Sequence, residues 1–416
     1  MADVQPLRAV HYDQATAGPL DRLTAPPYDV IDPAQRAELV RRSPHNVVEI
    51  DLPVGEDPYG HAAEVFERWQ LDGILTRDAD PAIWVQTQTF RGPDGVERTR
   101  NGFYARVGIT DYGQGRIRPH ERTHPAAKED RLRLMRATRA NLSPIFSLYS
   151  DPDGAAWATL APATEAEPFG AVTDDEGTTH RLWRVTDPAT IARVQEALAP
   201  AELLIADGHH RYETARTYAE EIGGEGAHRQ VLMNLVSMSD PGLAIFPTHR
   251  VVSGLDADRR RRLDELLERD FRLTDAEPEA AAPNGSGVPG FGLIDGDGSR
   301  ALRAELASPE IADRALEGHS ESYRRLDTAV LEKLVLEDAL GLTEDDISHQ
   351  RGLAYARDLQ QTMQLLGEGY DLAFMMRATP VEQVQAVAAA GETMPPKSTY
   401  FFPKLLSGLL FNPLWD

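Results

Sequence analysis

The segment Ala206–Tyr212 carries the residue types best suited to chemistry on a phosphate group. The apolar run Leu203–Ala206 predicts a short strand, and Asp207-Gly208 predicts a sharp turn before a helix. Such a junction directs backbone amides and the positive end of the helix dipole at one point. Gly208 lets the backbone approach a ligand closely, and Arg211 can bind two phosphate oxygens. We therefore predict a phosphate-binding turn here.

Two histidines and a carboxylate of this segment could move protons or hold a metal. His209 and His210 can donate to a transferring group or exchange a proton with it. Asp207 could bind Mg²⁺ or orient His209, and Mg²⁺ is expected because phosphoryl transfer requires charge neutralisation. The alternative is structural: an aspartate that caps a helix, followed by two surface histidines.

Further candidates lie in other motifs. Glu121, between basic residues, could accept the proton of a substrate hydroxyl or hold a metal, and a surface salt bridge is the alternative. Lys128 and Arg131, and later Lys397 and Lys404, are cations in an acidic chain. One or two of them could neutralise a polyphosphate, although each alone is more typical of a solvated surface.

Proline-marked turns supply the remaining candidates. Asp29 and Asn46 could bind substrate or cap the backbone of their turns. Lys397-Ser398-Thr399 follows two prolines and offers a cation, two hydroxyls and backbone amides. Because Arg211 alone cannot neutralise a transferring phosphate, we predict that this turn forms the second half of the cradle. The alternative is that it only docks the C-terminal segment.

Two patterns resemble cofactor motifs without the context that those motifs need. His120–His124 reads H-E-x-x-H, but prolines bracket it, whereas zinc requires both histidines on a rigid helix. Gly285–Gly290 reads G-x-G-x-x-G, but an Ala- and Pro-rich stretch precedes it and Pro289 would interrupt the helix that a dinucleotide requires. We expect neither zinc nor NAD.

The elements around these motifs mix strands and helices without strict alternation. Ala82–Phe90 and Arg98–Thr110 predict a hairpin, whereas Glu202–Ala206 and the residues up to Glu221 predict a strand followed by a helix. This mixture predicts an α+β fold. The Ala-, Pro- and Gly-rich stretch 277–290 predicts a linker between a core region, 1–276, and a C-terminal α+β region, 291–416, that returns to the active site.

The composition excludes several classes of function. A net charge of −23 repels nucleic acids and anionic membranes, so neither is expected as a partner. The absence of cysteine excludes thiolate nucleophiles and iron–sulfur clusters. The first ten residues lack a signal-peptide pattern, and no apolar run approaches the about 20 residues of a membrane helix. We expect a cytoplasmic protein with small-molecule partners.

The motifs also resemble a known family. Asp207–Arg211 resembles the signature of the ParB/sulfiredoxin-like superfamily, in the form found in free-serine kinases. Over nearly the whole chain the motifs are similar to those of the bacterial DUF1015 family, related to pyrophosphate-dependent serine kinases. The segments that carry this resemblance are Ala25–Val30, Ser43–Val48, His120–Thr123, Lys128–Arg131, Asp207–Tyr212, Pro247–Val251 and Met394–Lys404.

The resemblance implies a mixed-sheet ParB/sulfiredoxin-like catalytic core with N-terminal and C-terminal α/β segments packed around it. It also implies a kinase-like enzyme that transfers phosphate from pyrophosphate or a nucleotide to a small hydroxyl compound, L-serine. Two alternatives stay open: a ParB-like nuclease or DNA-binding protein, and a non-catalytic sensor of a phosphometabolite. DNA binding at low salt would identify the first, and ligand binding without turnover the second.

We predict that protein purified without an affinity tag contains well below one zinc per chain, because Pro119 and Pro125 bracket the H-E-x-x-H pattern. Elemental analysis measures this. One tightly bound equivalent that is lost in His124→Ala would contradict the prediction.

Overall fold

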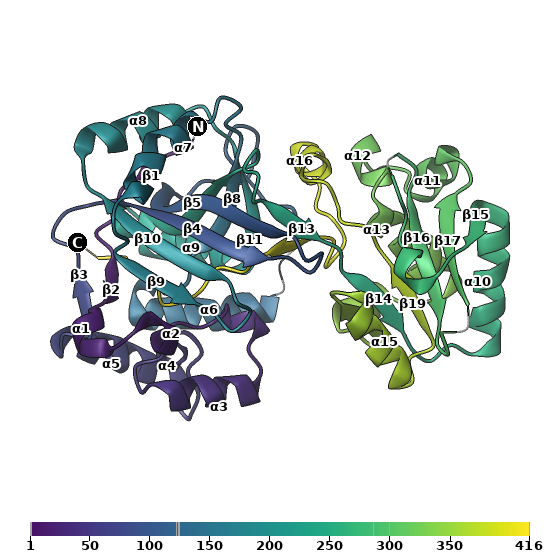
Figure 1. The fold of residues 1–416 in the computed structure, drawn as a ribbon, viewed down its shortest axis with the longest axis horizontal. Helices are drawn as coiled ribbons and strands as arrows, with labels where there is room; N and C mark the ends of the chain where they lie inside the picture. The colour runs from purple at the N-terminus through teal and green to yellow at the C-terminus, as the bar shows by residue number, and fades with distance from the viewer. Residues whose placement is uncertain (1, 122, 124, 286, 299, 416) are drawn as a thin grey trace. The chain divides into compact units, whose positions relative to one another are not determined.

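The chain is described from a computed structural model. The structure describes residues 2–415 apart from 122, 124, 286 and 299, and of residues 125–127 only the backbone. Two compact units are present (Figure 1). Unit 1 comprises Met1–Pro119, Thr123–Ala244 and Pro403–Asp416, and unit 2 comprises His120–Arg122 and Ile245–Phe402. Both terminal segments of the chain therefore belong to unit 1.

Unit 1 is built on a mixed sheet. In its described residues the strand order is β6-β11-β8-β12-β5-β4-β10-β9, and β1 pairs with β5. β12 runs parallel to β8 and β11 parallel to β6, whereas the other neighbours are antiparallel. The predicted α+β class with a mixed sheet is confirmed. The strands are β1 (Val4–Gln5), β4 (Ile83–Arg91), β5 (Glu97–Gly108), β6 (Ile117–Arg118), β8 (Ile145–Tyr149), β9 (Gly170–Thr173), β10 (Thr179–Val185), β11 (Leu203–Asp207) and β12 (Gln230–Ser237).

Both faces of this sheet are buried. Alternate side chains of a strand point to opposite faces, so one strand contributes to two hydrophobic cores. Trp84 and Tyr104 lie in one core, and Ile83 and Phe103 lie in the other. Figure 1 shows α5 below the strands and α8 above them. The longer helices of unit 1 are α3 (Pro33–Arg42), α5 (Pro58–Leu71), α6 (Pro125–Thr138), α8 (Pro188–Leu198) and α9 (His209–Ile222).

The two local predictions that matter most for the site are confirmed. β4 and β5 form the expected hairpin, with Thr89 opposite Thr99. β11 is followed directly by α9, so the strand–turn–helix junction lies at Asp207-Gly208. A β-bulge interrupts the pairing of β11 with β8 between Ile205 and Asp207, which re-aims the side chains at the end of the strand.

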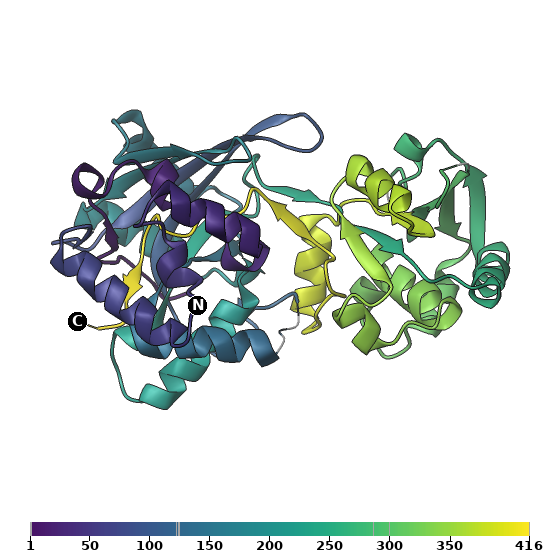
Figure 2. The ribbon, with the colours of Figure 1, turned by 90° about the horizontal axis from the view of Figure 1, so that it is seen from below.

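The last residues of the chain pack into unit 1. Phe411 exchanges two main-chain hydrogen bonds with Val10, and Ser407 donates its amide to the carbonyl of Ala25. β21 (Asn412–Pro413) pairs with β7 (Ala140–Asn141). Figure 2 shows this yellow segment beside the purple and blue N-terminal helices. The C-terminal segment is therefore an integral part of the unit that contains the junction.

Unit 2 has an antiparallel sheet of its own in the order β15-β17-β16-β19-β14-β18. The strands are β14 (His249–Val252), β15 (Phe271–Asp275), β16 (Gly290–Asp295), β17 (Ala301–Leu306), β18 (Leu353–Ala356) and β19 (Leu372–Met375). Helices α10 (Ala257–Asp270), α15 (Leu359–Gly367) and α16 (Val381–Ala389) belong to the same unit.

The stretch 277–290, where the composition predicts a linker, lies inside unit 2 between β15 and β16. The compact units divide near residue 245 because β14 pairs with β18 and β19, which come after the stretch. β16 begins at Gly290, where a dinucleotide motif would have opened a helix, and Ser286 of that pattern lies outside the described residues.

Phe411→Ala should destabilise unit 1 by about 3–5 kcal/mol, because it empties a fully buried aromatic site. All five tryptophans of the chain, Trp69, Trp84, Trp157, Trp183 and Trp415, belong to unit 1, so their fluorescence during urea unfolding follows that unit. Leu71→Ala is the control: Leu71 is 80% exposed, and its loss should change stability by less than about 0.5 kcal/mol. Equal midpoints for both variants would contradict the packing described for the C-terminal segment.

Candidate functional site

The junction at Asp207-Gly208 has the backbone geometry of an anion-binding turn. Gly208 has φ +96°, in the left-handed region that favours glycine, and α9 begins at the next residue. The first amides of a helix point toward its amino end, so those of α9 are directed at this turn. A Cβ atom on Gly208 would lie 3.0 Å from the Nε atom of Arg211. The site therefore needs glycine both for backbone conformation and for space.

The carboxylate of Asp207 lies between two cations. Arg211 donates to Oδ2 at 2.7 Å, and Lys404 donates from Nζ to Oδ1 at 2.8 Å. Burial alone would raise the pKa of Asp207, but the charges of Lys404 and Arg211 outweigh burial and lower it strongly. Asp207 is therefore ionised, and the three side chains together carry a net charge of about +1.

Arg211 is held from a second direction. Its Nη1 donates to the carbonyl of Pro144, at the start of the segment leading into β8. Burial would lower the pKa of Arg211, but the carboxylates of Asp207 and Asp29 raise it. Asp29, an exposed residue of the short helix Tyr28–Val30, thus contributes to the electrostatics of the site. Arg211 stays charged in a fixed position.

A small cavity adjoins Arg211. Its polar lining includes Tyr28, Asp51, Arg131 and Ser143, and its volume is about 40 Å³. This is enough room for ordered water beside the guanidinium of Arg211.

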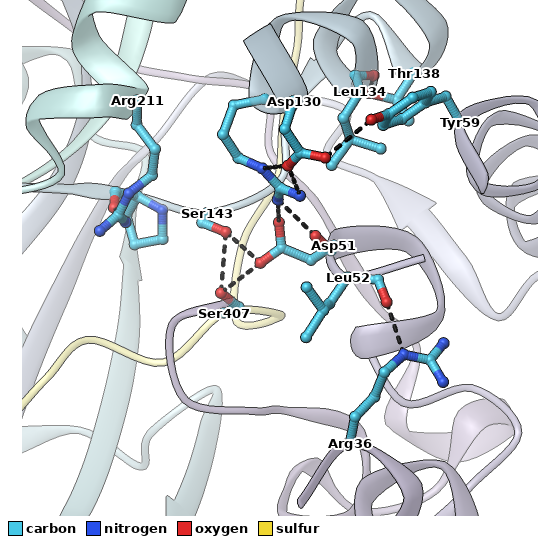
Figure 3. A network of polar contacts seen from close by, with 12 residues as sticks. Arg36, Asp51, Leu52, Tyr59, Asp130, Leu134, Thr138, Ser143, Arg211 and Ser407 are labelled. Carbon is cyan, nitrogen blue, oxygen red and sulfur yellow. Dashed lines mark hydrogen bonds and ion pairs between the residues drawn. The ribbon is translucent and has the colours of Figure 1, made fainter. Parts of the chain in front are cut away.

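Asp51, which lines this cavity, is the centre of a buried polar network (Figure 3). Ser143 and Ser407 donate to Oδ2 of Asp51 at 2.5 and 2.9 Å. Arg131 donates to the backbone carbonyl of Asp51 at 2.6 Å, and its guanidinium lies 4.1 Å from the centre of the Tyr28 ring. These contacts fix the wall of the cavity beside Arg211.

Two predicted residues of unit 1 have contacts that are structural. Asn46 is fully buried, donates to the carbonyls of Arg22 and Thr24, and accepts from the amide of Val48. These bonds hold its turn together. Lys128 lies on α6, and its backbone carbonyl accepts a long, 3.5 Å hydrogen bond from Thr214 of α9.

His209 and His210 occupy the first turn of α9, and His209 is buried while His210 is partly exposed. His209 also contributes to the low pKa of Asp207, although less than Lys404 and Arg211 do. The structure thus brings Asp207, Gly208, the two histidines and Arg211 together. The catalytic roles predicted for the histidines stay predictions.

Glu121, Lys397, Ser398 and Thr399 belong to unit 2, so the two-sided cradle with Arg211 stays a prediction. Within unit 2, Lys397 is exposed and has φ +56°. Ser398 is buried and donates to the carbonyl of Pro395, which fixes the turn.

Oγ1 of Thr399 lies 2.9 Å from Nε2 of His120, the first residue of the H-E-x-x-H pattern. Arg122 and His124 of that pattern lie outside the described residues. The contact shows that His120 and the C-terminal turn share one environment in unit 2.

The sequence missed part of the site. Asp51, Ser143 and Ser407 are not among the residues that the sequence predicts. Tyr28 is not among them either, although it precedes the predicted Asp29 in the same proline-marked motif. Lys404 was predicted only as a possible cation. A charged residue between apolar neighbours, such as Asp51 between Ile50 and Leu52, was the one available signal.

The described residues offer limited scope for a metal. No cluster of three or more His, Cys, Asp or Glu side chains suited to a metal occurs among them. Of the two residues predicted as possible metal ligands, Asp207 accepts hydrogen bonds from cations at both of its oxygens, and Glu121 belongs to unit 2. Among the helices that the structure describes, none has the length and apolar character that a bilayer crossing requires.

The fold and the junction together define a mixed α+β protein with a positively charged strand–turn–helix site. The chain belongs to the protein family described as "Protein of unknown function (DUF1015)", whose model matches residues 4–329. No curated protein matches the chain.

Three solved structures illustrate its similarity to known proteins. A free serine kinase in complex with AMP has a TM-score of 0.37 and 14% identity, over 70% of this chain and 88% of the other. A conserved hypothetical protein from Pyrococcus furiosus has a TM-score of 0.35 and 16% identity, over 70% and 92%. A C-terminally truncated SbnI from Staphylococcus aureus has a TM-score of 0.37 and 15% identity, over 72% and 84%.

Asp207→Asn should destabilise unit 1 at neutral pH by about 1–3 kcal/mol, because two cations lose their charged acceptor. The folded-state pKa of Asp207 is lowered, so its stabilising effect is complete above the unfolded-state pKa of about 4 and is lost as the pH falls through the folded pKa. The difference between wild type and variant should therefore shrink below about pH 4.

Urea unfolding followed by tryptophan fluorescence measures this difference. Asp111→Asn is a matched control, because it removes a carboxylate that is 74% exposed and pairs with Arg216, and it should cost about 0–1 kcal/mol at any pH. A difference for Asp207→Asn that does not vary with pH would contradict the ion-pair assignment.

Proposed function

We propose that this chain is a phosphotransferase that moves a phosphoryl group from pyrophosphate or a nucleotide to the hydroxyl of a small molecule. The observation that carries the proposal is the net positive Asp207–Arg211–Lys404 cluster at the amino end of α9. In a chain of net charge −23, this local charge and the amides of the turn favour a small phosphate over an extended polyanion.

Each member of the cluster has a role in this proposal. Arg211 and the backbone amides after Gly208 bind the donor phosphate, since a guanidinium and a helix amino end both suit phosphate oxygens. Lys404 neutralises charge that develops on the transferring group. Asp207 holds both cations in position, because it accepts a hydrogen bond from each.

Mg²⁺ fits the site only together with the donor. In proteins the ion is commonly held by one or two carboxylates plus substrate phosphates and water, which agrees with a single carboxylate at Asp207. When bound, Mg²⁺ would neutralise charge on the phosphate oxygens. Asp207 would bind it after giving up one of its two hydrogen bonds, so we propose that Mg²⁺ affinity depends on the donor.

Glu121, His209 and His210 are the proposed candidates for the base that accepts the hydroxyl proton. The two histidines lie directly after the phosphate-binding turn, which favours them on position within unit 1. Glu121, with Lys397, Ser398 and Thr399, would have to contribute from unit 2. All three are residue types that can accept a proton in general-base catalysis.

L-Serine is the proposed acceptor. It rests on the resemblance of Asp207–Arg211 to the signature found in free-serine kinases. Pyrophosphate, ADP and ATP are the donors to compare, since each presents a terminal phosphate that Arg211 and Lys404 could bind. Asp29 is proposed to contact the acceptor, because its exposed carboxylate lies close enough to Arg211 to raise the pKa of that side chain.

Arg211→Ala should reduce phosphate transfer by about 10²–10³-fold without unfolding the chain, because one charged contact to the transition state is lost. The measurement is ³¹P NMR of a screen of small alcohols, including L-serine, against pyrophosphate, ADP and ATP with Mg²⁺. Arg216→Ala is the matched control, since Arg216 lies on the same helix but pairs with Asp111.

Full turnover by a folded Arg211→Ala variant would contradict the phosphate site. Binding of a phosphate donor without turnover of any acceptor would favour a sensor over an enzyme. Tight DNA binding at low salt would favour the ParB-like alternative instead.

A further inference from the structure

Two buried side chains hold the main chain at the point where Lys404 leaves it. Nη2 of Arg100 donates to the carbonyl of Pro403 at 2.7 Å, and Nε2 of Gln88 donates to the carbonyl of Lys404 at 3.3 Å. Arg100 also donates to Oε1 of Gln88 from Nε at 3.0 Å and from Nη2 at 2.6 Å. Arg100 and Gln88 thus bind each other and also hold the carbonyl groups of two successive residues.

The pair is built into the sheet. Gln88 of β4 lies directly opposite Arg100 of β5, and His180 of β10 lies opposite Gln88 on its other side. Nδ1 of His180 lies 3.3 Å from Nε2 of Gln88, and its Nε2 lies 2.9 Å from Asp174. Paired strands in the core are among the most stable parts of a domain. The hydrogen bonds to the carbonyls of Pro403 and Lys404 therefore come from side chains on a rigid backbone.

Burying the guanidinium of Arg100 between these strands costs free energy. Its side chain is fully buried, its guanidinium lies 4.4 Å from the centre of the Phe146 ring, and burial lowers its pKa to about 9. Desolvating a cation costs several kcal/mol unless its hydrogen bonds compensate. Two of the acceptors that compensate here are Gln88 and Pro403, so the orientation of the guanidinium is tied to the position of the C-terminal segment.

We propose that Arg100 is a positioning residue that, through Gln88 and the carbonyl of Pro403, fixes Lys404 against Asp207. Any consequence for catalysis rests on the proposed phosphotransferase function, whereas the positioning itself does not. Lysine has a long and flexible side chain, and holding the backbone on both sides of its Cα reduces the freedom that the ion pair with Asp207 must restrict.

Because the chain has only four lysines, the restraint on Lys404 can be measured by chemical labelling, without an activity assay. Lys128, Lys333, Lys397 and Lys404 are the four lysines. Brief acetylation of the amines, followed by peptide mass mapping, gives the reactivity of each. Lys333, which pairs with Glu337 and Asp338, is the internal reference. In Arg100→Gln, Lys404 should react about tenfold faster than in wild type, the factor expected when a charge-assisted hydrogen bond no longer restrains it.

Arg36→Gln is the matched control, since Arg36 also donates to a main-chain carbonyl of unit 1, that of Leu52 rather than that of Pro403 (Figure 3). It should leave the reactivity of Lys404 unchanged. Arg100→Lys, which can donate to only part of the same acceptors, should give an intermediate value. If Arg100→Gln does not fold by tryptophan fluorescence, Gln88→Glu decides: it keeps an acceptor for Arg100 but removes the donor to the carbonyl of Lys404, and should raise the reactivity severalfold.

Unchanged reactivity of Lys404 in a folded Arg100→Gln variant, or in Gln88→Glu where the first does not fold, would overturn the proposal. Where the screen detects phosphate transfer, Arg100→Gln should lower kcat more than it raises KM, because Lys404 would act on developing charge. If no transfer is found for wild type, the proposed function fails while the labelling result still decides the positioning.

Discussion

The carboxylate of Asp207, shared by Arg211 and Lys404, is the interaction on which the candidate site depends. Arg211 comes from the next turn of the chain, whereas Lys404 follows Asp207 by 197 residues. An aspartate between two cations in a partly buried position keeps its charge, and its charge in turn keeps both cations oriented. The result is a fixed group of charges, net positive, at the amino end of a helix.

This arrangement requires that the C-terminal segment be anchored, and two kinds of interaction anchor it. Apolar burial is the first: the buried apolar side chains of the segment are Leu405, Leu406, Leu409, Leu410, Phe411 and Leu414. Buried polar groups are the second, because Ser407 binds Asp51 and Arg100 binds the carbonyl of Pro403. Apolar contacts are non-directional, so the polar contacts are the ones that fix the register of the segment.

The proposed phosphate site is compatible with the acidic composition of the chain. Long-range repulsion from a net charge of −23 is screened within about 8 Å at physiological salt, whereas Arg211 and the α9 amides act at contact distance. Arg131 is committed to Asp51 and Asp130, so it supports the wall of the cavity rather than adding to the free positive charge. In the proposed function, selectivity for a small anion comes from a few charges held in position.

The sequence by itself determined the local part of this site. An apolar run before Asp207-Gly208 specifies a strand that ends in a left-handed glycine and a helix, because only neighbouring residues take part, and the α+β class and the β4–β5 hairpin follow in the same way. Only the tertiary structure decided that Lys404, Ser407 and Asp51 join it. Their pairing depends on where distant segments pack, and neither a lysine beside Pro403 nor an aspartate beside Ile50 specifies its partner. The division near residue 245 was likewise decided by strand pairing between segments far apart in the chain, which composition does not encode.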